Sequence, residues 1–166
     1  MTDRAIFNRR YTSFTADSTE VFLVNGAGVT TTPVTTLSFT AGENLDQGDV
    51  VYVSGTYVLA ASAASGVAET NWSAIGITSE AASASASVNV ILDDIAVISS
   101  GNILFDSALT PGQYYYLGRE AGKLTSFSAP SGVTASGGYA VLAPIGLALS
   151  ASELSVEIAP ITILYD

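Results

Sequence analysis

The chain of 166 residues is long enough for one well-buried core, or for two small cores that share an interface. Hydrophobic residues make up 48% of it, charged residues only 12%, and its net charge is −10, so we expect it to hide much of its surface or to live in an assembly. It has no histidine and no cysteine, which removes the commonest general base and excludes disulfides and thiolate metal sites.

The few basic residues gather near the N-terminus. Arg4, Arg9 and Arg10 are three of the five, and no Lys or Arg occurs between Tyr11 and Gly118. Because nucleic-acid affinity comes mainly from Lys and Arg, the acidic body predicts no nucleic-acid partner. The basic segment could contact nucleic acid or an acidic protein groove, and its short length favours the groove. No apolar run approaches 18 residues and no export signal is visible, so we expect no membrane partner.

Residues 1–19 are polar apart from isolated apolar side chains, and such a segment cannot bury enough apolar area to fold alone. It predicts an extended N-terminal arm that is either flexible or ordered by docking. A first short strand follows at 21–24, closed by the Asn-Gly turn dipeptide at 25–26. Residues 29–36 contain five threonines and one proline, which predicts an extended linker or an edge strand.

The next segment, 37–98, alternates short apolar runs with small polar turns. Residues 49–53 and 56–59 predict a hairpin around Ser54-Gly55. The Ser- and Ala-rich stretch 80–87 predicts a loop, and residues 88–92 then alternate apolar and polar side chains as a half-buried strand does.

The last segment, 99–166, has the same order of features. Residues 114–117 and 123–125 predict a hairpin across 119–122, and strands are expected at 138–143 and 161–164. Between these two strands, alternating apolar side chains at Leu154, Val156 and Ile158 repeat the pattern of 88–92.

The chain therefore contains an internal duplication, from about Leu37 to Asp166. The matched stretches are 45–53 with 109–117, 74–77 with 144–147, 88–92 with 154–158, and 95–97 with 161–163. Val90 with Val156, and Ile75 with Ile145, are expected to occupy equivalent core sites. We predict an all-β fold: an antiparallel β-sandwich or barrel of roughly ten strands, built from two repeated β-units and preceded by an extended N-terminal arm.

Candidate chemical groups all have a structural interpretation. A Ser-Lys nucleophile would need Lys123, which is interpreted as a solvated turn residue. Asp93 and Asp94 are adjacent on an extended segment, so they point to opposite faces and are expected to end a strand rather than to act together on a glycoside. We therefore predict no catalytic residues and no enzymatic activity.

The stretch 43–49 faintly resembles part of a calcium loop, because several oxygen ligands surround a glycine. The second repeat favours a plain turn, since Thr110 and Gln113 replace Asp46 and Asp49. We accordingly predict no metal site and no cofactor.

Aromatic side chains could stack on sugars if they were exposed. On a strand, Tyr114 and Tyr116 share one face and Tyr115 takes the other, so only part of this triplet can be exposed, and we favour packing for it and for Trp72. Among the small residues, Gly76 and Gly146 predict a close backbone approach or a β-bulge.

The second repeat combines a glycine turn and an aromatic strand at 109–117, a Gly-Lys-Leu hairpin at 121–125 and a late Ile-Gly strand at 144–150. This combination resembles a β-unit of structural proteins in tailed bacteriophages, where it occurs in capsid decoration (cement) proteins and in fibre or tail components. The resemblance covers about 37–166 as two copies and implies a non-enzymatic virion protein.

From these patterns we expect a capsid decoration protein, located on the outer capsid surface of the virion, whose partner is the major capsid protein. The alternative is a phage tail, fibre or head-fibre accessory protein that binds a host receptor or glycan. The expected division is 1–36 for the arm and first strand, 37–98 for the first β-repeat and 99–166 for the second, with a homo-oligomer, favoured as a trimer. The predicted capsid-binding arm consists of Arg4, Ile6, Phe7, Arg9, Arg10 and Tyr11.

Overall fold

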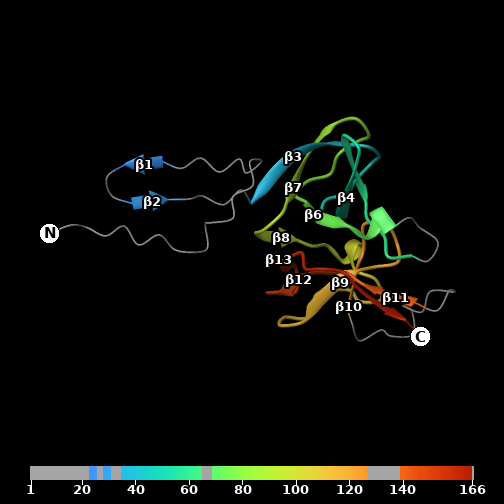
Figure 1. Cartoon of the computed structure of the whole chain (residues 1–166). Helices are drawn as coiled ribbons and strands as arrows, with labels where there is room; N and C mark the ends of the chain where they lie inside the picture. Colours follow the sequence, from blue (N-terminus) through green and yellow to red (C-terminus); the bar gives the residue numbers. More distant parts are fainter. Residues whose placement is uncertain (1–22, 26–27, 31–34, 65–68, 127–138, 166) are drawn as a thin grey trace. The chain divides into compact units, whose positions relative to one another are not determined.

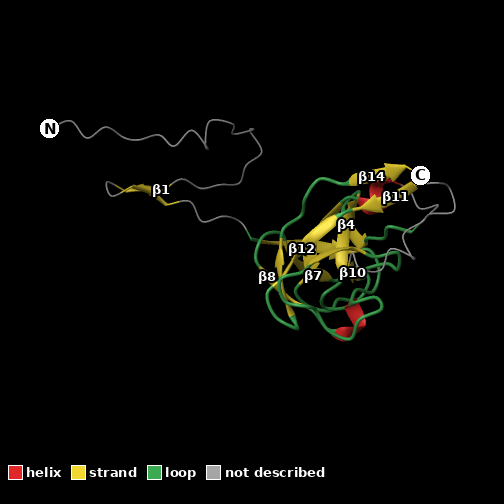
Figure 2. Ribbon diagram, turned by 90° about the horizontal axis from the view of Figure 1, so that it is seen from below, coloured by secondary structure: helices red, strands yellow, loops and turns green. Residues whose placement is uncertain are grey.

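The computed structural model describes residues 23–25, 28–30, 35–64, 69–126 and 139–165. The chain divides into two compact units, 1–34 and 35–166. The predicted all-β fold is confirmed: the described residues form fourteen strands and only short 3-10 helices (Figures 1 and 2). The strands exceed the expected ten, and several, such as β2 and β8, are only three residues long.

The N-terminal unit contains one described hairpin, β1 (Leu23–Asn25) and β2 (Gly28–Thr30), in antiparallel register with Asn25 opposite Gly28. The first strand predicted at 21–24 overlaps β1, and the residues that join β1 to β2 lie outside the described residues. The capsid-binding arm predicted at 1–19 lies outside the described residues.

The first β-unit of the body is a closed five-stranded barrel in the order β3-β5-β4-β6-β7. Its elements are β3 (Thr36–Ala41), β4 (Val50–Ser54), β5 (Tyr57–Ala60), the 3-10 helix η2 (Glu69–Trp72), β6 (Ala74–Thr78) and β7 (Ser87–Ile91). A two-residue loop joins β4 to β5, as predicted, but it comprises Gly55 and Thr56, with Gly55 at a φ of 63° that favours glycine.

The second β-unit is a five-stranded sheet in the order β10-β9-β12-β13-β8. Its elements are β8 (Ile95–Val97), the 3-10 helix η3 (Ser100–Asn102), β9 (Tyr114–Leu117), β10 (Leu124–Ser126), β12 (Pro144–Ala148) and β13 (Glu153–Val156). A separate antiparallel pair, β11 (Tyr139–Leu142) and β14 (Thr162–Tyr165), completes the body. In Figure 1 the barrel runs from cyan to green and the second sheet from yellow to red.

The two β-units have the same strand pairing. Strands β8, β9, β10, β12 and β13 correspond to β3, β4, β5, β6 and β7. With this correspondence every strand pair of the second sheet also occurs in the barrel, and only the pair β3–β5 has no counterpart between strands. The parallel pair β3–β5 closes the barrel, and in the second unit a single parallel bridge between Ile103 and Leu124 joins the corresponding ends. Strand β8 therefore starts the second β-unit, and its sequence match to 161–163 is not a structural equivalence, since β14 pairs with β11.

Turn and bulge hydrogen bonds repeat as well. The backbone N–H of Gly48 donates to Thr78 O at 3.0 Å, and that of Gly112 donates to Ala148 O at 2.8 Å. Both β6 and β12 carry a register shift just before a glycine. These shifts confirm the predicted bulges at Gly76 and Gly146.

The glycines at the bulges also permit a close approach of two backbones. A Cβ atom on Gly76 would lie 2.2 Å from Ile91 O, and one on Gly146 would lie 2.1 Å from Ser155 O. Ile75 and Ile145 are the residues skipped by the two bulges, as their predicted equivalence requires, although Ile75 is half-buried and Ile145 fully buried.

Val90 and Val156 are both buried, as predicted, but they are not equivalent to each other. Val90 lies opposite Thr78, and the residue opposite Ala148 in the second unit is Leu154. The match is therefore shifted by two residues. A two-residue shift keeps every side chain on its face, so the alternating pattern alone cannot detect it.

Two clusters of buried side chains form the core. One lies within the barrel and includes Val51, Val58 and Val88. The other combines the second sheet, including Tyr115 and Ile145, with side chains from the opposite face of the barrel strands. The second sheet therefore packs on the outside of the barrel.

Candidate functional site

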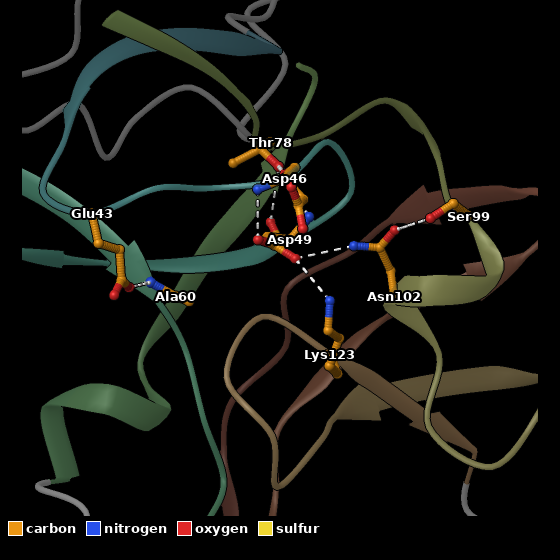
Figure 3. A network of polar contacts seen from close by, with 8 residues as sticks. All are labelled: Glu43, Asp46, Asp49, Ala60, Thr78, Ser99, Asn102 and Lys123. Atoms are coloured by element: carbon orange, nitrogen blue, oxygen red, sulfur yellow. Dashed lines mark hydrogen bonds and ion pairs between the residues drawn. The ribbon is translucent and has the colours of Figure 1, made fainter. Parts of the chain in front are cut away.

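A network of polar side chains lies where the second β-unit meets the barrel (Figure 3). Its centre is Asp49, which precedes β4 and is only 6% exposed. Oδ2 of Asp49 accepts a hydrogen bond from the backbone N–H of Asp46 at 2.9 Å. Oδ1 accepts from Nδ2 of Asn102 at 3.0 Å and lies 3.5 Å from Nζ of Lys123. One carboxylate thus joins the turn before β4 to two segments of the second β-unit.

Neighbouring side chains hold Asn102 and the Asp49 turn in place. Oδ1 of Asn102 accepts from Oγ of Ser99 at 2.5 Å, which orients its amide towards the carboxylate. The hydroxyl of Thr78 donates to Asp46 O at 2.6 Å and accepts from the backbone N–H of Asp49 at 3.0 Å. Because these buried groups are paired, the network is a rigid joint.

The loop between β9 and β10 completes this joint with backbone contacts. The N–H of Val50 donates to Gly122 O at 2.9 Å, and the N–H of Gly122 donates to Ala61 O at 2.8 Å. A Cβ atom on Gly122 would lie 2.7 Å from Oδ1 of Asp49, and its φ of 76° also favours glycine. Only glycine therefore lets this loop approach the carboxylate.

Burial raises the pKa of the Asp49 carboxyl above its ordinary value, because removal from water disfavours the charged form. The hydrogen bond from Asp46 N–H and the positive charge of Lys123 act in the opposite direction but do not cancel the effect of burial. Solvent partly screens the ion pair, since the Lys123 side chain is 22% exposed.

The interpretation of Lys123 as a solvated turn residue is wrong. It does lie in the predicted hairpin turn, but its ammonium pairs with the buried Asp49 of the other β-unit. Sequence reasoning missed this joint and Asn102 as a whole. The available signal was the difference between the repeats, because the polar pair Asp49 and Thr78 has Gln113 and Ala148 as its counterparts.

The oxygen-rich stretch 43–49 does not converge on one point. Oε1 of Glu43 accepts from the backbone N–H of Ala60 at 2.8 Å, and Oδ1 of Asn44 accepts from that of Ala84 at 3.0 Å. In the described part of the chain, no group of three or more acidic side chains is placed to hold a metal ion. These oxygens satisfy backbone donors at the end of β5 and in the loop before β7, which is a structural role.

Asp93 and Asp94 are exposed in the bend between β7 and β8, where Oδ1 of Asp94 accepts from the N–H of Ile95 at 2.8 Å. Their predicted place at a strand end is confirmed.

The tyrosine triplet divides as predicted. Tyr115 is fully buried and its hydroxyl accepts from the backbone N–H of Thr110 at 3.0 Å, whereas Tyr114 is 46% exposed. Tyr116 is half-buried, and Trp72 is buried as expected.

Trp72 also lines a small pocket of about 280 Å³. The other lining residues come from the start of β6, from 143–145 and from 158–161, and Ser73 is the only one with a polar side chain. Such a lining has few groups that could orient a polar ligand.

A comparison with protein-family models and with curated proteins found no match to this chain. Among the described residues, none of the helices has the length and apolar character needed to cross a membrane.

Proposed function

We propose that this chain is a non-enzymatic virion protein that decorates and stabilises the outer surface of a phage capsid by binding the major capsid protein. The observation that carries the proposal is the division of charge between two units. Residues 35–166 contain twelve of the fifteen acidic residues and only two of the five basic ones, whereas Arg4, Arg9 and Arg10 lie in the separate unit 1–34. A basic arm on an acidic body suits an extended contact with another protein.

The contacts of the body support a structural role. The strongest candidates for chemistry, Asp49 and Lys123, hold two β-units together. The side-chain oxygens of Glu43 and Asn44 accept hydrogen bonds from backbone N–H groups of Ala60 and Ala84. These groups stabilise the fold, and the resemblance of the two β-units to phage structural proteins points to the same class of function.

The arm would provide the attachment. Arg4, Arg9 and Arg10 alternate with Ile6, Phe7 and Tyr11, so charged and apolar anchors are interleaved. Fixing an extended chain costs about 1 kcal/mol per residue in backbone entropy, which means that several anchors must act together.

Deletion of Met1–Thr12 tests the proposal. The truncated protein should keep the circular dichroism spectrum and melting temperature of the β-body but bind preassembled capsids far more weakly in co-sedimentation. High salt should weaken the intact protein less than the deletion does, because apolar anchors are not screened. Full occupancy of capsids by the truncated protein would refute attachment by the arm.

A second candidate is a tail, fibre or head-fibre accessory protein that binds a host receptor or glycan. The observation in its favour is the exposed ring of Tyr114, since exposed aromatic rings can stack on sugars. Copy number separates the two functions. Hundreds of copies per purified virion, measured by gel densitometry against the major shell protein, would favour decoration, and tens or fewer would favour a fibre.

A further inference from the structure

One face of the second sheet is apolar and uncovered. Strand register places Tyr114 opposite Leu147, Leu147 opposite Ser155, and Ser155 opposite Ile95, so these four side chains form one row on one face. Val97 extends the face by its alternate position on β8. Tyr114, Ile95 and Val97 are 46%, 50% and 55% exposed. We call this surface the outer face of the second unit.

The first β-unit has the same row in the same register. Val50 lies opposite Ile77, Ile77 opposite Ile91, and Ile91 opposite Thr36. Here the first three side chains are at most 8% exposed, because the second β-unit packs on them. In the first β-unit this face is therefore covered by another β-unit with the corresponding strand order.

The loop between the strands β9 and β10 anchors the second unit beside this face, since the N–H of Val50 donates to Gly122 O and the N–H of Gly122 donates to Ala61 O. Its counterpart in the first β-unit is the β4–β5 loop, Gly55-Thr56, flanked by Val53 at 43% and Tyr57 at 46% exposure. Each chain thus has one uncovered face and one exposed apolar hairpin end, whose counterpart in the second unit is the loop that anchors the units to each other. We call residues 53–57 the hairpin end.

We propose that a second copy of this chain covers the outer face of the second unit with its own hairpin end. The contact is head to tail, because it joins two different surfaces, and such contacts close into rings where the rotation permits. A ring of three would be the trimer expected from the sequence. This inference does not depend on the capsid proposal.

The proposed contact is apolar rather than charged. Gln113 stands where the first unit has Asp49, and the hairpin end contains no charged residue that could repel Glu153 on the outer face. Without a charged joint the association should be weaker than the contact within the chain, dependent on protein concentration and little affected by salt.

The test uses full-length variants in sedimentation velocity over a range of protein concentrations. Tyr114→Asp alters the outer face and Tyr57→Asp alters the hairpin end, and each should leave the protein monomeric. An equimolar mixture of the two should form dimers but nothing larger, because it contains one intact face and one intact hairpin end. Phe105→Asp, at the 75% exposed Phe105 outside these strands, is the matched control and should associate like the parent.

Circular dichroism melts check that each variant is folded. A parent that stays monomeric at all concentrations would overturn the proposal. Normal association of Tyr57→Asp would also overturn it, because the outer faces would then meet each other or another segment. The double variant Phe7→Asp with Tyr11→Asp should associate normally, and its failure would show that the N-terminal arm is the occupant instead.

Discussion

In the first β-unit the outer row of Val50 and Ile77 packs against another β-unit, whereas the corresponding Tyr114 and Leu147 of the second unit remain partly exposed. Strand order, bulges and turn hydrogen bonds are the same in both. The backbone of a repeat is therefore fixed by turns and packing within it. The side chains of its outer face instead differ according to whether another β-unit packs on that face.

The largest expected effect tests the core that both units share. Val90→Asp and Val156→Asp should each lower the free energy of unfolding by about 4 kcal/mol or prevent folding, because an unpaired carboxylate would be buried. Urea unfolding followed by circular dichroism measures this. Ser87→Asp, at an exposed position of β7, is the control and should change little.

The bulges give a second test of equivalence. Gly76→Ala and Gly146→Ala should each cost about 3 kcal/mol, since the new methyl group would overlap a carbonyl oxygen of the neighbouring strand. Gly101→Ala has no atom closer than 3.8 Å to the new Cβ and should be tolerated. If thermal melts show only one bulge glycine to be essential, the two bulges are not equivalent.

Truncation of the outer rows tests the difference between the units. Ile77→Ala should cost about 3 kcal/mol, because Ile77 is fully buried between the units, whereas Leu147→Ala should cost about 1 kcal/mol in the monomer. Chemical denaturation of both variants at low protein concentration makes the comparison. Equal losses would mean that the second row is covered within the monomer.

The polar joint between the units is centred on Asp49 of the first unit, and the second unit has Gln113 at the equivalent position. Asp49→Ala should cost about 2 kcal/mol, because it leaves the amide of Asn102 and the backbone N–H of Asp46 without their acceptor. Gln113→Ala, at the equivalent position, should change stability by less than about 0.5 kcal/mol. Denaturant titrations that give similar losses for both would assign Gln113 a structural contact comparable to that of Asp49.

Whether the sequence predicts a structural feature depends on how far apart in the chain the residues that form it are. Alternation and turn glycines are local, so the all-β class, the hairpins and the bulges at Gly76 and Gly146 could be predicted. The pairing of β8 with β13 could not, because a three-residue strand has almost no pattern. The contact between Asp49 and Lys123 joins residues far apart in the chain, and no local pattern indicates it.

The smallest expected effect concerns pH at this joint. Because burial raises the pKa of Asp49, the folded state binds the proton more tightly than the unfolded state, whose pKa is near the ordinary 3.8. The contribution of Asp49 to stability is therefore greatest below pH 3.8 and falls as pH rises through the raised pKa. Urea titrations from pH 3 to pH 7 should show this fall in the parent relative to Asp49→Asn, which cannot ionise there. A parent that instead gains stability relative to Asp49→Asn with rising pH would show that the Lys123 charge and the hydrogen bonds outweigh burial.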